Sequence, residues 1–157
     1  MPHPLKTYDL KQVQFVIGGR DISGYAEDGG LEVAPSVDIG TPTVGSVGHA
    51  VFSRSNNHSG MVTVTLGEWT QGYADLAELM QAQELIDGAL VPLNILIRDQ
   101  LNGDKYSDRW AAFTKRPNGD KGAVAGERVF EIFCPNLFDP TTVEYGTSNL
   151  LSNLTNG

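Results

Sequence analysis

The 157-residue sequence has little cysteine and no long apolar run. Its single cysteine, Cys134, excludes an internal disulfide and a zinc site built from several thiolates. No stretch reaches the about 18 consecutive apolar residues that a membrane-spanning helix needs, and residues 1–10 hold no apolar segment typical of a secretion signal. We therefore expect one soluble domain over residues 1–157, folded in a reducing cytoplasm and without a membrane partner.

Positive charge is scarce as well. Lys and Arg number 11 against 19 Asp and Glu, which gives a formal net charge of −8. This balance argues against holding nucleic acid or an anionic membrane by bulk charge. Residues 21–97 carry ten acidic side chains and one basic one, Arg54. The acidic block is either a solvated surface, a face that associates with a more basic face, or the wall of an acidic channel.

Residues with the usual chemistry of an active site are few and poorly placed. His3, His49 and His58 fall in the N-terminal segment and in a glycine- and serine-rich stretch, where a precise geometry is hard to maintain. The serines lack a G-x-S-x-G context, and the glycines lack the Gly-Lys-Ser/Thr ending of a phosphate-binding loop. We predict a protein that is not an enzyme, with no catalytic residue, metal site or cofactor.

Glycine and proline divide the rest of the chain into short runs of alternating apolar residues, which are typical of strands. We predict strands over residues 11–17, 31–37, 61–66, 93–98, 105–115 and 128–134, with a hairpin turn at Gly18-Gly19. The fold class is mainly β: an antiparallel β-sandwich or barrel with one α-helix, which leaves at least one open sheet edge.

The helix is predicted over residues 74–87, with Gly88 after its last turn. Its apolar residues recur every three or four positions, so one side packs on the sheet and the other is exposed. The inward residues are Leu76, Leu79, Met80 and either Leu85 or Ile86, and the outward ones include Glu78 and Gln81.

Residues 40–60 are the least ordinary segment, because glycine, serine and asparagine predominate and core-forming residues are few. We interpret the segment as a long loop that becomes ordered when it lies across a neighbouring subunit; a flexible surface loop is the alternative. Residues 135–157 are expected to be irregular. The candidate residues of this inter-subunit arm are Val47, His49, Val51, Phe52 and Arg54.

Several segments together resemble a known family. They are Thr7-Tyr8-Asp9, Lys11-Gln12-Val13, the run from Gly19 to Asp28, and residues 43–48 and 58–66. In this order the chain resembles the tail tube proteins of tailed bacteriophages, particularly of the contractile-tailed group, over residues 7–135. The resemblance implies a tail-tube-like β protomer that forms hexameric rings, which stack into a hollow tube through which DNA leaves the capsid.

The resemblance also implies partners and a location. The partners are other copies of the chain and the tail sheath, baseplate and tape-measure proteins, in a virion assembled in the cytoplasm of the host bacterium. DNA is expected to pass an acidic lumen without specific binding. Two alternatives remain: a tube protein of a bacterial contractile injection or secretion system, and a small acidic ligand-binding β domain.

The lumen of such a tube would be lined by strand residues that alternate with apolar core residues. The strands near residues 31–37, 61–66, 93–98 and 128–134 are expected to form the pore-facing sheet, continued from one protomer to the next. The candidate lumen-facing residues are Thr63, Thr65, Asn94, Arg98 and Glu131.

Overall fold

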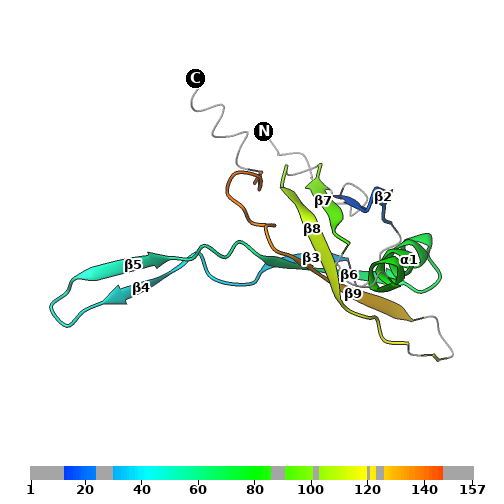
Figure 1. Ribbon diagram of the computed structural model, residues 1–157, viewed down its shortest axis with the longest axis horizontal. Coiled ribbons are helices and arrows are strands. Elements are labelled where there is room, and N and C mark those ends of the chain that lie inside the picture. The colour runs from blue at the N-terminus through cyan, green and yellow to red at the C-terminus, as the bar shows by residue number, and fades with distance from the viewer. Residues whose placement is uncertain are drawn as a thin grey trace, which may run out of the picture.

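The structure, a computed structural model, describes residues 13–23, 30–85, 91–100, 103–119, 121–122 and 126–146. These ranges form nine strands and one helix (Figure 1). In chain order the elements are β1 (Val13–Ile17), β2 (Arg20–Asp21), β3 (Leu31–Pro35), β4 (Gly40–Val44), β5 (Ala50–Arg54), β6 (Gly60–Gly67), α1 (Gln71–Leu85), β7 (Leu93–Asp99), β8 (Lys105–Lys115) and β9 (Glu127–Cys134).

Seven strands form one antiparallel sheet in the order β2-β1-β7-β8-β9-β6-β3. The long strand β8 joins its two halves, because its first residues pair with β7 and its last residues pair with β9. The mainly antiparallel β fold with one helix is confirmed. No sheet of the described ranges closes into a barrel, which corrects that part of the prediction: the end strands β2 and β3 lie at opposite edges and do not pair with each other.

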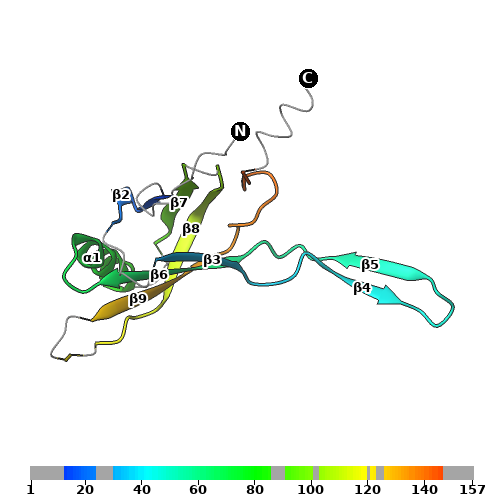
Figure 2. The same cartoon turned by 180° about the vertical axis from the view of Figure 1, so that it is seen from behind.

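One face of the sheet carries the core, and α1 covers it (Figure 2). On the central strands every second residue is buried, which is the period of a strand with one covered face. The largest buried apolar side chains are Phe15, Ile17, Val62, Val64, Leu66, Leu76, Ile95, Phe130, Ile132 and Leu137.

The helix begins at Gln71, three residues before the predicted start. Thr70 explains the difference, because its Oγ1 accepts a hydrogen bond from the backbone N–H of Tyr73 at 3.3 Å and so caps the first turn. At Gly72 the helix passes so close to the chain that a Cβ would lie 2.0 Å from the carbonyl oxygen of Ser23. Only glycine permits this approach.

The predicted inward side of the helix is largely confirmed. Leu76 and Met80 are buried and Leu79 is partly buried, while Glu78 and Gln81 are exposed. Leu85 is 80% exposed, so it does not pack on the sheet, and its alternative, Ile86, lies outside the described residues together with residues 87 and 88.

Gln83 is a buried polar residue on the inner side of α1, and it joins the helix to β8. Its amide nitrogen donates to the carbonyl oxygens of Val91 at 2.8 Å and Ala111 at 3.2 Å, and its Oε1 accepts from the N–H of Phe113 at 3.0 Å. All three partners are backbone groups: Val91 lies just before β7, and Ala111 and Phe113 lie where β8 passes from one half of the sheet to the other. The amide is therefore well satisfied and fixes the helix at the junction of the two halves.

The turn predicted at Gly18-Gly19 is confirmed. Both glycines have positive φ, at 59° and 81°, as a two-residue hairpin turn requires.

After β9, residues 135–146 follow the free edge of β8, where Lys105 and Glu144 form an isolated bridge. The part of the predicted irregular segment beyond residue 146 lies outside the described residues. No helix in the described ranges is long and apolar enough to cross a membrane.

Candidate assembly interface

Strands β4 and β5 form a two-stranded arm that projects from the body of the molecule (Figure 1). The register pairs Gly40 with Arg54 and Val44 with Ala50, and the N–H of Gly45 donates to the carbonyl oxygen of His49 at 2.8 Å in the turn. This hairpin corrects the expectation of a long loop over residues 40–60. Few apolar residues are needed, because cross-strand backbone hydrogen bonds hold the two strands together.

The arm has no packing partner among the described residues. Residues 41–54 are all exposed, and Phe52 and Val51 keep 58% and 61% of their surface in contact with solvent. A single hairpin is marginally stable in water, and exposed apolar side chains at this density are typical of contact surfaces. The five predicted arm residues, Val47, His49, Val51, Phe52 and Arg54, all lie on this hairpin and are exposed.

The root of the arm is fixed to the body by a network of short-range hydrogen bonds. The side-chain oxygen of Asn57 accepts from the N–H of Ser59 at 3.0 Å and from its hydroxyl at 2.6 Å. The carbonyl oxygen of Ser59 accepts from Ser36, and that of His58 accepts from Phe138, at 3.0 and 2.9 Å. These bonds join both strands of the arm to the sheet and to the C-terminal segment, so the arm leaves the body in a defined direction.

The second candidate surface is the face of the seven-stranded sheet opposite α1, which we call the open face. Along β7, Asn94 and Arg98 alternate with the buried Ile95 and Ile97. In the other half, Thr63 and Thr65 of β6 and Glu131 of β9 alternate with buried residues in the same way, and Thr63 is the register partner of Glu131. The register therefore brings all five predicted lumen residues to the open face, in two groups.

Charge is segregated between the two halves of the open face. Arg98 pairs in register with Lys105, and Arg109 follows further along β8, so this half is predominantly basic, with Asp21 at its edge. The other half carries Glu32, Glu127 and Glu131, beside a single base, Lys115. The open face is thus mixed in charge, although the chain as a whole is acidic.

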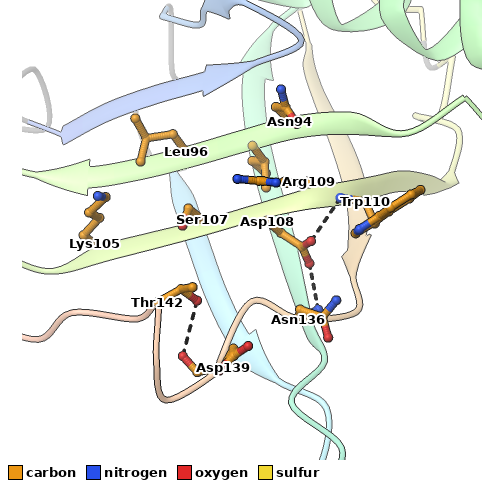
Figure 3. Close-up of a pocket in the computed structure, with 11 residues that line it drawn as sticks. Asn94, Leu96, Lys105, Ser107, Asp108, Arg109, Trp110, Asn136, Asp139 and Thr142 are labelled. Atoms are coloured by element: carbon orange, nitrogen blue, oxygen red, sulfur yellow. Dashed lines mark hydrogen bonds between the residues drawn. The ribbon is translucent and has the colours of Figure 1, made fainter.

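A cavity of about 620 Å³ lies between the basic half of the open face and residues 136–142 (Figure 3). The buried carboxylate of Asp108 accepts hydrogen bonds from the N–H groups of Trp110 at 3.0 Å and Asn136 at 2.7 Å. Asp139 accepts from the N–H and the hydroxyl of Thr141, and these bonds lower its pKa. Both carboxylates are therefore committed to fixing the chain that follows β9.

A charge pair between the buried Arg128 and the partly exposed Glu68 lies at the other end of β9. Arg128 is only 2% exposed, and its guanidinium donates to the carboxylate of Glu68 and, at 3.0 Å, to the carbonyl oxygen of Glu127. A hydrogen bond with the backbone of Gly126, followed by the charges of Lys121 and Arg128, lowers the pKa of Glu68. This pair joins the segment before α1 to the last strand.

Groups suited to metal chemistry do not come together in the described part of the chain. No cluster of three or more His, Cys, Asp or Glu side chains in these ranges is arranged to hold a metal ion. His49 lies in the turn of the arm and His58 at its root. Burial, and to a lesser extent the charge of Asp108, raises the pKa of Cys134 to about 12, so its thiol stays protonated.

A match to a known protein family covers most of the chain. Residues 7–135 match the family described as the bacteriophage PhiTE tail tube protein. The chain belongs to this family. A tail tube protein is a structural component of a virion tail.

A solved structure has a similar fold. A chain of the sheath/tube terminator of PVC, an extracellular contractile injection system in its extended state, superposes with a TM-score of 0.52 over 85% of this chain and 94% of that chain. The two sequences are 12% identical, so this likeness shows the fold alone. No curated protein matches the sequence.

The sequence pattern does not identify three buried polar residues of this tail tube protein that hold segments of the fold together. Gln83 lies at an inward position of the predicted helix, but nothing in the sequence names its backbone partners. Asp108 and Arg128 fall at positions of β8 and β9 that alternate with exposed residues, as the apolar core residues do. A charged residue at a core position of a strand was the available signal, and it points to a buried partner.

Proposed function

We propose that this tail tube protein assembles with copies of itself into hexameric rings, which stack to form the inner tube of a phage tail and the conduit for DNA ejection. The observation that carries the proposal is the projecting arm, whose residues 41–54 are all exposed. An arm that has no packing partner in the described part of its own chain is stabilised when another copy covers its apolar side chains.

The open sheet supports contacts within a ring. β3 and β2 are its end strands, and each leaves one side of its backbone without a strand partner in the described ranges. Strand addition from a neighbouring copy would satisfy these groups and continue the sheet around a ring. The acidic half of one copy, which ends at β3, would then lie next to the basic half of its neighbour, which ends at β2.

The open face is the proposed lumen wall, with Thr63, Thr65, Asn94, Arg98 and Glu131 as its lining candidates. Around a ring the basic and acidic halves would alternate, so no continuous positive track would follow the phosphates of a duplex. Such a wall supports passage of DNA without specific binding. A lumen formed by this face would be mixed in charge, which differs from the acidic lumen expected from the net charge of the chain.

The proposed partners other than further copies of the chain rest only on its membership of the tail tube family. Tail sheath, baseplate and tape-measure proteins, and assembly in the host cytoplasm, are proposed on that basis. A tube role in a contractile injection system is the second candidate, favoured by the fold of the PVC terminator chain. A ligand-binding β domain is the remaining alternative, and the family match does not favour it.

The test is assembly of the purified full-length chain, followed by sedimentation velocity and negative-stain microscopy over a range of concentrations. The matched variant replaces residues 41–53 by Asn-Gly, a two-residue turn that connects the register partners Gly40 and Arg54. We expect tubes from the wild type, and a folded protomer that forms no tubes from the variant. Tubes of normal length from the armless variant, or a monomeric wild type at all concentrations, would contradict the proposal.

A further inference from the structure

A groove of about 800 Å³ lies at the root of the arm, where the segment between β3 and β4 faces the chain after β9. Its walls are mainly apolar and come from regions far apart in the sequence. Its principal apolar lining residues are Val37, Ile39, Phe52, Phe138, Val143 and Tyr145. Ile39 is 85% exposed, so the described chain leaves this groove uncovered.

The tip of the arm has the complementary character. Val47 in the turn is 83% exposed, and Val44 beside it is 68% exposed. Figure 2 shows the turn between β4 and β5 at the end of the arm that is farthest from the body. The paired strands keep the arm extended, so the tip of one chain lies away from the groove at its own root.

We infer that the arm tip of one copy docks in the root groove of a second copy. The inference rests on the proposed function and names the contact through which the arm acts. Because tip and groove are different parts of the surface, the contact is heterologous: each copy donates one tip and accepts another. Repetition of such a contact yields a ring or a helical stack, as a tube requires.

The lack of formal charge in the arm tip supports the tip of a second copy as the occupant of the groove. Residues 41–53 contain no Asp, Glu, Lys or Arg, so the tip enters an apolar groove without burying an unpaired formal charge. The tip carries one histidine, His49, and the groove is lined by one acidic residue, Asp38, and by a histidine, His58. Asp38 is therefore the group of opposite sign that a positively charged His49 would meet there, and His58 is not.

Other exposed apolar groups suit the groove less well. Trp69 is 68% exposed, but its ring lies against Gly67, where a Cβ would be 2.8 Å from it, so it is held on its own chain. Trp110 lies on β8 within the body of the molecule. The arm tip is the apolar group that projects far enough to enter a concave site on another copy.

The test is disulfide formation between two single-cysteine-substituted full-length chains, V47C at the tip and V143C in the groove. The variants are mixed, assembled and oxidised at pH 8, then analysed on a non-reducing gel. The native thiol gives little background, because Cys134 is buried and its pKa is raised to about 12. The matched control pairs V47C with Q81C, an exposed position on α1 away from the groove.

We expect a V47C–V143C dimer and no V47C–Q81C dimer. Tubes that form without the V47C–V143C dimer would overturn the docking while leaving the proposed function intact. The dimer without tubes would support the docking and overturn the stacked rings. Neither dimer nor tubes would overturn both. Tip-to-tip dimers of V47C alone, in excess of the mixed product, would also contradict docking in the groove.

A second pair of variants tests the apolar nature of the contact. V47D places a charge at the tip, and V47S is its neutral control. Because Val47 is exposed, both variants should melt like the wild type. We expect loss of tubes and loss of the cross-link with V47D and a weaker effect with V47S, and normal assembly of V47D would overturn the inference.

Discussion

The ring of Phe52 covers Gly40 across the arm, so closely that a Cβ on residue 40 would lie 2.5 Å from the ring and 2.7 Å from the carbonyl oxygen of Ser53. The two residues are not direct register partners, since Gly40 pairs with Arg54 and Phe52 with Pro42. The contact therefore runs diagonally between the strands. It sets the position of an aromatic ring that also lines the root groove.

The first prediction concerns this contact. Gly40→Ala should displace the ring of Phe52 and loosen the arm, because neither the ring nor the backbone of Ser53 leaves room for a Cβ. We expect faster amide exchange in residues 50–54 and reduced tube formation, with the melting temperature of the body unchanged. The control is Gly45→Ala, where the nearest atom to a Cβ is 3.7 Å away. Equal exchange in both variants would show that the contact between Phe52 and Gly40 does not hold the arm together.

The second prediction concerns the helix. Leu76 is fully buried between α1 and the sheet, and Leu85 of the same helix is 80% exposed. Leu76→Ala should lower the free energy of unfolding by about 2–5 kcal/mol, since a cavity remains in the core. Leu85→Ala should change it by less than about 0.5 kcal/mol. Chemical denaturation of the two variants measures the difference, and similar losses would show that α1 is not docked as described.

Much of the fold could be predicted from the sequence. In segments such as residues 61–66 and 128–134 apolar residues recur at every second position, and this alternation indicates a strand with one buried face. The hairpin at residues 40–54 could not. Its strands carry Gly40, Pro42 and exposed polar residues, and its pairing is held by backbone hydrogen bonds that do not depend on side-chain pattern. The start of α1 was missed because Thr70 acts as a cap one residue before Gln71.

The candidate surfaces were predictable in part for the same reason. Alternation places Asn94 and Arg98 on the face opposite the core, and it does the same for Thr63 and Glu131. The segregation of charge between the two halves was not predictable. It depends on the strand order, which brings β7 and β8 together on one side and β9, β6 and β3 on the other. Strand order is a long-range property that a local pattern does not contain.

The third prediction concerns the pair of Glu68 and Arg128. Glu68→Gln should destabilise the protein at neutral pH, because it leaves the buried guanidinium of Arg128 without its carboxylate. The pKa of Glu68 is lowered from its ordinary value of 4.5, so its ionised form favours the folded state. This contribution is present above pH 4.5 and is lost as the pH falls through the lowered pKa of the folded state.

Urea denaturation of wild type and Glu68→Gln from pH 7 to pH 3 measures this contribution. The difference in unfolding free energy should be constant near neutral pH and shrink below pH 4.5. A difference that stays the same down to pH 3 would show that the charge of Glu68 does not stabilise the fold.

The fourth prediction concerns Asp108. Asp108→Ala removes the acceptor for the N–H groups of Trp110 and Asn136. Because these groups are partly buried, we expect a loss of about 1–3 kcal/mol in the free energy of unfolding. Asp139→Ala is the control, since its partners on Thr141 are exposed, and its loss should be smaller. Thermal and chemical denaturation compare the two, and an equal loss would contradict the anchoring role of Asp108.

The most direct test of the proposed tube is a cryo-electron microscopy map of particles assembled from the full-length chain alone. We expect a hollow tube of stacked rings, in which the arm formed by β4 and β5 contacts another copy and Arg98 and Glu131 line the lumen. A map in which the arm stands free in solvent, or in which the open face of the sheet forms the outer wall and α1 faces the lumen, would contradict it.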